Sequence, residues 1–325
     1  MMGDFCKRCL IPAGVLSAGL VLYALIAFGD GRPAKPPRVD SAPTSRPSGI
    51  AYTKARKLGV LAEGAIDESS GLASGRVNPG VFWTHNDSGD QPRLYAFNRA
   101  GEALATCTIR GARARDWEDM CSFAAGRKGV LLVGDVGDNG RQRDHCTLYA
   151  VKEPRLDATR RGVRLVLPVS QAVRFRYSEG PANCESIGYD PTSQTVLIVT
   201  KTGRSPCRVY TMSWPDKSPA KPIVLRPIAT LRIPAAVGMD VSPDGRRAVV
   251  LTYGPAYEWT RGRGETWAQA FARRGRVLPM PFRRQGESIC YGPDGMTLYL
   301  TSERRPTPLL ELPILKTPAS APAGR

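Results

Sequence analysis

One pattern recurs five times along the chain and restricts its fold more than any other feature. Each copy has an acid, a short stretch of alternating apolar residues, a turn with Gly, Pro, Asp or Asn, and an apolar β-rich run with a polar end. The aligned acids are Glu68, Glu118, Glu185, Asp240 and Glu287. They lie roughly 47 to 67 residues apart, close to the length of one four-stranded propeller blade.

Two further strands recur at fixed places in the copies. A third strand follows the polar end in RLYAFN, TLYAVKE, RVYTMSW and LLELPI, and a fourth precedes each acid in KLGVLAEG, TCTIRG, VRFRYS, ATLRIP and VLPMPF. The fourth-strand sequence at 57–64 precedes the first acid, so we expect it to complete the last blade and close the ring. The sequence predicts an all-β propeller of about five blades, with six as the alternative, over residues 58–315. A helical insertion at 265–274 is expected on the fourth blade.

The N-terminal region has the composition of an export signal. Lys7 and Arg8 precede an uncharged stretch from Leu10 to Phe28, which is long enough either for a membrane anchor or for a signal that is cleaved near residue 28. The preceding positive charges place the rest of the chain outside. We therefore expect residues 1–29 to be a signal peptide or membrane anchor, 30–57 a Pro-rich stalk and 316–325 a disordered tail. The protein is expected in the cell envelope or secreted.

The charge balance favours anionic partners. The chain has 46 basic and 29 acidic residues, a formal net charge of +17. The basic residues are scattered and are not interleaved with aromatic residues, so we expect no binding of nucleic acid. An anionic small molecule is the expected substrate or ligand, and the N-terminal segment is the expected contact with a membrane.

The cysteines allow two interpretations. Six lie in the expected propeller, and an even number in an exported domain favours disulfides. Cys107 and Cys121 flank one connection between strands, so they are the first pair to expect. The alternative is that the cysteines are buried free thiols. No spacing typical of a zinc site occurs.

The repeat predicts which residues share a face. The acid opens the first strand and the second strand returns antiparallel, so the polar residues at the end of the second strand lie beside the acid. The opposite face receives the turns, such as AAGRKG and SPDGR. We predict catalytic roles for His85, Asp87 and Asp135. We predict substrate binding by Asn86, Arg93, Asp138, Asn139, Arg141, Arg143, Lys201 and Glu303.

The five aligned acids predict a metal. First strands of a propeller line its axis, and converging carboxylates cannot all stay ionised without a cation or protons. Calcium, with six to eight oxygen ligands, suits such a ring better than magnesium does. The alternative is that each acid pairs with Arg or caps a loop. The loops NDSGD and GDVGDN are candidates for a second metal, or are ordinary turns. His85 is a candidate general base or phosphate donor, with a structural role as the alternative.

Other catalytic classes lack their motifs. The chain has no G-x-S-x-G elbow, no G-x-G-x-x-G and no P-loop, which argues against a serine hydrolase of that type and against nucleotide cofactors.

Several of these segments together resemble a known family. WTHNDSGDQPRLYAFNRAG, DWEDM, GDVGDN, the NCES segment, MDVSPDGRRAVVLTY and QGESICYGPDG are similar to the exported phytase-like propellers, also described as having esterase-like activity of phytase. The resemblance implies a phosphoester or ester hydrolase. The axial acids also resemble, in architecture alone, those of the calcium-activated nucleotidases. Three hypotheses follow: a calcium-dependent hydrolase of phosphate esters or other esters, a sugar-lactone hydrolase, or a non-catalytic propeller that binds an anionic ligand or a protein.

Overall fold

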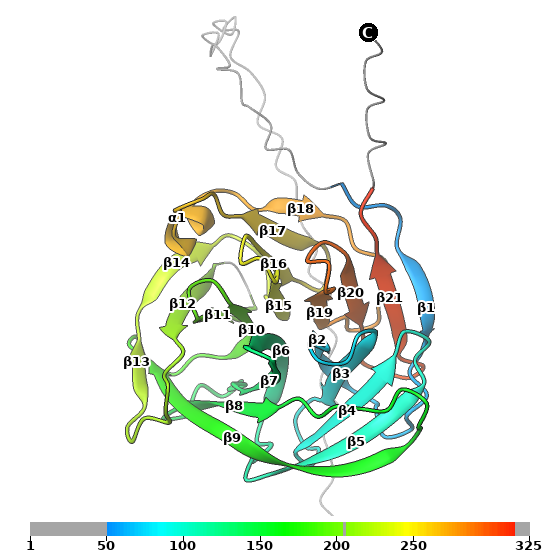
Figure 1. Cartoon of the computed structure of the whole chain (residues 1–325). Helices are drawn as coiled ribbons and strands as arrows, with labels where there is room; N and C mark the ends of the chain where they lie inside the picture. Colours follow the sequence, from blue (N-terminus) through cyan, green and yellow to red (C-terminus); the bar gives the residue numbers. More distant parts are fainter. Residues whose placement is uncertain (1–50, 204–205, 316–325) are drawn as a thin grey trace, which may run out of the picture. The chain divides into compact units, whose positions relative to one another are not determined.

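Four-stranded sheets repeat five times around an axis in the computed structural model, which describes residues 51–203 and 206–315 (Figure 1). Blade 1 contains β2 (Ser69–Ser74), β3 (Val81–Asn86), β4 (Arg93–Asn98) and β5 (Ala103–Arg110). Blade 2 contains β6 (Trp117–Ala125), β7 (Lys128–Asp135), β8 (Cys146–Lys152) and β9 (Val163–Tyr177). Blade 3 contains β10 (Cys184–Asp190), β11 (Thr195–Thr200), β12 (Cys207–Ser213) and β14 (Pro227–Leu231).

The last two blades complete the ring. Blade 4 contains β15 (Gly238–Val241), β16 (Arg247–Leu251), β17 (Ala256–Thr260) and β18 (Arg276–Leu278). Blade 5 contains β19 (Ser288–Tyr291), β20 (Leu298–Thr301), β21 (Pro308–Leu312) and the N-terminal β1 (Arg56–Val60). Pairing within each blade is antiparallel. The predicted all-β propeller of five four-stranded blades is confirmed.

The first strand of each blade faces the axis. These strands, β2, β6, β10, β15 and β19, contact one another in that order, and β19 contacts β2 (Figure 1). The N-terminal strand also closes the ring, because β1 pairs with β21 and completes the last blade, with Arg56 opposite Glu311. The predicted closure by the segment at 57–64 is confirmed. Pairing extends further toward the N-terminus through a bridge between Tyr52 and Ile314.

Strand β9 departs from the simple repeat. It pairs antiparallel with β8 and parallel with β5, and the short β13 (Ile223–Leu225) pairs parallel with its far end. Figure 1 shows β9 running along the outer edge of the propeller past both blades. Its half-buried Val163, Leu165, Leu167 and Val169 alternate with exposed residues, as expected for a strand with one face on the core. The outer edges of blades 1 and 2 are thereby covered.

The helical insertion is shorter than its predicted range. Helix α1 (Trp267–Ala272) begins at Thr266, whose side chain accepts from the Gln269 N–H in a capping box. The buried Trp267, Ala270 and Phe271 pack in a cluster with apolar residues of blades 3 and 4. The helix therefore lies between these two blades and not on the fourth alone.

The six cysteines of the propeller are buried free thiols. Cys107 lies on β5, the fourth strand of blade 1, whereas Cys121 lies on β6 at the axis. The predicted Cys107–Cys121 disulfide is therefore wrong, because neighbours in sequence across a blade boundary are separated by the radius of the propeller. Burial raises the pKa of the Cys107 thiol to about 12, so it acts as a small apolar side chain.

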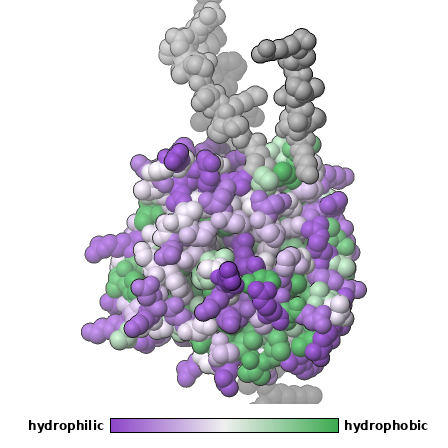
Figure 2. Space-filling view, in the orientation of Figure 1, coloured by the Kyte–Doolittle hydropathy of each residue, from purple (hydrophilic) through white to green (hydrophobic). Residues whose placement is uncertain are grey.

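The predicted signal or anchor, most of the stalk and the tail lie outside the described residues. Among the residues that the structure describes, no helix has the length and apolar character needed to cross a membrane. Figure 2 shows a mostly hydrophilic face, with apolar side chains confined to smaller areas.

Candidate functional site

Carboxylates from four of the five blades gather at one end of the axis. We call this cluster the acidic mouth, and it consists of Asp87, Asp116, Glu118, Glu185, Glu287 and Glu303. Glu118 and Glu185 lie at the start of β6 and β10, Glu287 directly precedes β19, and Asp87 follows the end of β3. The starts of first strands and the ends of second strands thus meet on one face, as the repeat predicts.

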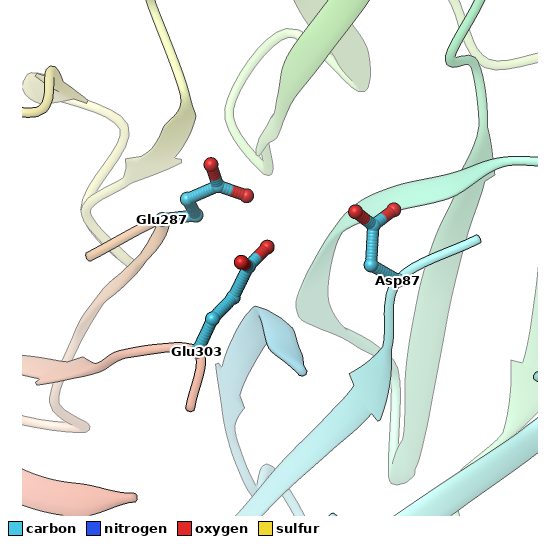
Figure 3. A group of neighbouring side chains, drawn as sticks. All are labelled: Asp87, Glu287 and Glu303. Carbon is cyan, nitrogen blue, oxygen red and sulfur yellow. The ribbon is translucent and has the colours of Figure 1, made fainter. Parts of the chain in front are cut away.

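Two groups of three carboxylates share Asp87. Oxygen atoms of Asp87, Glu287 and Glu303 lie within 4.8 Å of one another, and the same holds for Asp87, Asp116 and Glu118. Figure 3 shows Glu287 and Glu303 extending from blade 5 toward Asp87, which faces them from blade 1. Each group brings carboxylates from two blades together.

Gly137 lies in a loop against two acids of the mouth, and its lack of a side chain allows this close contact. At Gly137 a Cβ atom would collide with the carboxylates of both Asp116 and Glu118. Arg143 holds the loop in place, because its guanidinium donates to the Asp135 carboxylate (2.9 Å) and to the Gly137 carbonyl (2.8 Å). The loop therefore presses uncharged backbone against two acids.

Burial and like charge both disfavour ionisation in the mouth. Glu118 is only 3 % exposed, and its carboxylate has no hydrogen-bond donor within the described residues. Burial, followed by Glu185 and Asp87, holds the pKa of Glu118 well above its usual range. Burial and Glu287 raise the pKa of Glu303 to about 9, and burial raises the pKa of Asp87 to about 6.

Within the described residues, one cation forms an ion pair with the cluster. Lys201 Nζ lies 2.5 Å from Glu185 Oε2 and 2.9 Å from the Tyr253 hydroxyl, and that hydroxyl donates to Glu287 Oε1 at 2.5 Å. Burial raises the pKa of Glu185 to about 7, although Lys201 opposes the shift. Among the described residues, Glu185 is the one acid of the mouth that forms an ion pair. One ion pair therefore serves a cluster of six carboxyl groups.

Three of the five aligned acids, Glu68, Glu185 and Asp240, lie outside the two groups of three carboxylates. Glu68 is exposed, and its backbone bridges to Glu303 at the rim. Asp240 is buried and accepts hydrogen bonds from the N–H groups of Val241 and Tyr291, both at 2.8 Å. Main-chain N–H groups therefore satisfy Asp240, as they do Asp119, the residue that directly follows Glu118 on β6.

His85 is placed in the core. It is fully buried on β3, its ring meets Trp117 edge to face, and its Nδ1 donates to the Asn86 carbonyl at 2.8 Å. Burial lowers its pKa to about 4. This environment fits the structural role that the sequence left as the alternative.

Most predicted substrate-binding residues are engaged in local contacts. The Asn86 side-chain oxygen accepts hydrogen bonds from the N–H groups of Asp67 and Glu68. Arg93 forms an ion pair with Asp90. Asp138 accepts from the N–H groups of Gln142 and Arg143. These contacts order the loops around the mouth. Asn139 accepts from Asn183, whose side chain also donates to Glu185 of the mouth, and Arg141 is exposed.

Three residues of the site were missed in the sequence. Asp116 precedes Glu118 by two positions in DWEDM, and Tyr253 follows the second strand of blade 4. Asp119 lies next to Glu118, and its carboxylate accepts from the N–H groups of Met120 (2.8 Å), Ile187 (2.9 Å) and Met239 (3.1 Å). Asp119 therefore connects three blades at the axis. The density of acids in DWEDM was the available signal.

Comparisons with known proteins leave the family open. No protein-family profile matches the sequence, and no curated protein does. Among solved structures, a gluconolactonase from Xanthomonas campestris has 12 % identity and a TM-score of 0.45, over 83 % of this chain and 99 % of its own. The structure of U3-55K has 12 % identity and a TM-score of 0.39, over 75 % of this chain and 67 % of its own. At these values neither likeness informs on activity, and the phytase-like resemblance stays a prediction.

Proposed function

We propose that the acidic mouth binds a divalent cation, that this cation is calcium, and that the loaded mouth hydrolyses a phosphate ester or another ester. The observation that carries the proposal is Glu118, a buried carboxylate with no hydrogen-bond donor in the described chain that faces other acids. A buried carboxylate without hydrogen-bond donors needs a proton or a cation.

The residues fit calcium on chemical grounds. Every donor in the two groups is a carboxylate oxygen, and hard cations take such ligands in place of nitrogen or sulfur. Asp87, Glu287 and Glu303 form the first ligand set, and Asp116 with Glu118 extends it from the other side of Asp87. Gly137 keeps the space beside these acids free of a side chain.

Hydrolysis requires a polarised substrate oxygen and a group that takes a proton from water. Calcium supplies the first of these when bound. Glu185, the acid of the mouth that forms an ion pair with Lys201, is the candidate that takes the proton from water. Tyr253 is 49 % exposed, so its hydroxyl can reach a substrate at the rim. An exported protein would meet calcium at the concentrations that weaker sites need.

A second candidate, ligand binding without hydrolysis, is favoured by one observation. His85 is buried and Arg93 and Arg143 are ion-paired, which leaves few free groups for acid–base chemistry and anion binding within the described residues. In that case the cation serves folding and capture of an anionic ligand.

The test is hydrolysis of p-nitrophenyl phosphate, p-nitrophenyl acetate and a sugar lactone by the exported domain, with calcium or with chelator. We expect calcium-dependent turnover of at least one of them, reduced at least about tenfold in Glu303→Gln. Glu102→Gln, an exposed acid on the outer edge paired with Arg161, is the matched control and should keep full activity. Calcium binding without any turnover would reject the hydrolase in favour of the binding protein.

A further inference from the structure

The face opposite the acidic mouth has a groove of about 560 Å³ between blades 1 and 2. Its walls come from the turn after β2, the turn between β6 and β7, the end of β8 and the middle of β9. Because β6 runs away from the mouth and β7 returns to it, the turn at 126–127 lies on the far face. We call this region the far-face groove.

Positive charge surrounds the groove. Arg127, Lys128, Lys152 and Arg155 line it, and all four side chains are exposed. None of the four forms an ion pair within the described residues. The groove therefore presents unpaired cations from two neighbouring strand connections and from the strand ends beside them.

The one acid that lines the groove does not offset these charges at the surface. Glu153 is buried, and its carboxylate accepts from the N–H groups of Arg76 (2.8 Å) and Val77 (3.0 Å) and from the side chains of Asn78 (2.7 Å) and Trp83 (3.2 Å). These four donors hold the carboxylate beneath the groove. The lining that a partner would meet is basic.

Between the cations the lining is apolar. Val77, Pro154 and Leu167 are half-buried there, and Pro168 is exposed. A bare phosphate chain gains nothing from such a surface, and no aromatic side chain lines the groove for stacking a base. A lipid bilayer presents a broad surface, which a concave groove does not match. An extended peptide with alternating acidic and apolar side chains matches both the cations and the apolar lining.

We propose that the far-face groove docks an acidic, partly apolar peptide segment of a partner protein. The site lies at the opposite end of the blades from the acidic mouth, so docking leaves the mouth open. The proposal does not depend on the proposed function, because none of its residues belongs to the mouth. Binding through exposed cations is expected to weaken as salt is raised.

The experiment measures fluorescence anisotropy of a labelled peptide of alternating Glu and Leu with the purified protein. We expect saturable binding at low salt, about tenfold weaker in Lys128→Glu/Arg155→Glu, since two favourable charge contacts become repulsive. Lys221→Glu/Arg226→Glu changes two exposed basic residues on either side of β13 that have no ion pair within the described residues. It alters the net charge equally and should bind like the parent.

Three results would overturn the proposal: no binding of the peptide, equal weakening by both charge reversals, or tighter binding of inorganic polyphosphate or phosphatidylglycerol vesicles than of the peptide. If the first reversal variant does not fold by circular dichroism, Arg127→Gln/Lys152→Gln replaces it. That neutral variant should weaken binding about threefold, and unchanged binding would overturn the proposal equally.

Discussion

The acidic mouth and the far-face groove both concentrate charge of one sign, yet they differ in burial. The mouth gathers carboxylates from several blades, and Glu118, Glu287 and Glu303 are buried. The groove carries its cations on exposed positions such as Arg127 in a turn and Lys128 at the start of β7. Water screens the exposed charges, so they repel one another weakly, whereas buried carboxylates that face one another require a proton or a cation. The acidic mouth therefore needs protons or a cation for stability, whereas the far-face groove needs no bound counter-charge.

The largest expected effect comes from the buried acid that the protein itself satisfies. Asp119→Ala would leave three N–H groups of three blades without their acceptor. We expect a loss of about 3–5 kcal/mol in the free energy of unfolding, measured by urea denaturation. Asp216→Ala, at an exposed position, is the control and should change it by less than about 0.5 kcal/mol. A loss below about 1 kcal/mol for Asp119→Ala would show that buried acids at the axis are not structurally special.

The next effect is a pH dependence of the calcium-free protein. Burial and neighbouring acids raise the pKa of Glu303 from 4.5 to about 9 and that of Glu185 from 4.5 to about 7. Between pH 4.5 and 9 the folded state therefore binds more protons than the unfolded state, and stability must fall as pH rises. We expect a decrease of about 1–2 kcal/mol after allowance for solvent screening, measured by chelator-treated urea unfolding at several pH values.

The same series has an internal control. Glu303→Gln should flatten the dependence, because it removes a carboxyl group whose pKa is raised to about 9. A stability that is constant or rises with pH over this interval would contradict the view of the mouth as a set of uncompensated acids.

The smallest effect is expected in the groove. Lys128→Ala/Lys152→Ala removes two exposed cations that have no ion pair in the described chain. We expect the free energy of unfolding to change by less than about 0.5 kcal/mol, with no added dependence on pH. A loss above about 1 kcal/mol would remove the contrast between the two regions, since it would give the exposed charges a structural role.

The repeated acid made the propeller predictable, but not the exact composition of the mouth. The pattern of an acid followed by a strand specifies the blade and its direction, which is why Glu118, Glu185 and Glu287 were placed correctly on one face. It does not specify register. The first strands of blades 1, 2 and 3 have an irregular register at or next to the acid, whereas β15 and β19 pair regularly. Asp240 lies buried on β15, whereas Glu287 directly precedes β19.

Other differences arise from burial and from distance, which a linear pattern does not contain. His85 is polar and follows a strand pattern, and only packing against Trp117 reveals it as a core residue. The length of β9 was missed because Pro168 interrupts the alternation that marks a strand. The third strand of blade 4, β17, was missed as well, since AYEWT lacks the pattern of its counterparts. The far-face groove was not anticipated, because each of its turns taken alone has ordinary turn composition.

The central claim is that the acidic mouth requires a divalent cation, and calcium titration calorimetry of the chelator-treated domain tests it most directly. We predict saturable binding with a rise in the unfolding temperature, equivalent to about 2.7 kcal/mol at a hundredfold excess over the dissociation constant. Glu118→Gln/Glu303→Gln should abolish both effects, whereas Glu102→Gln should preserve them. No heat of binding, together with identical unfolding curves in calcium and in chelator, would contradict the account.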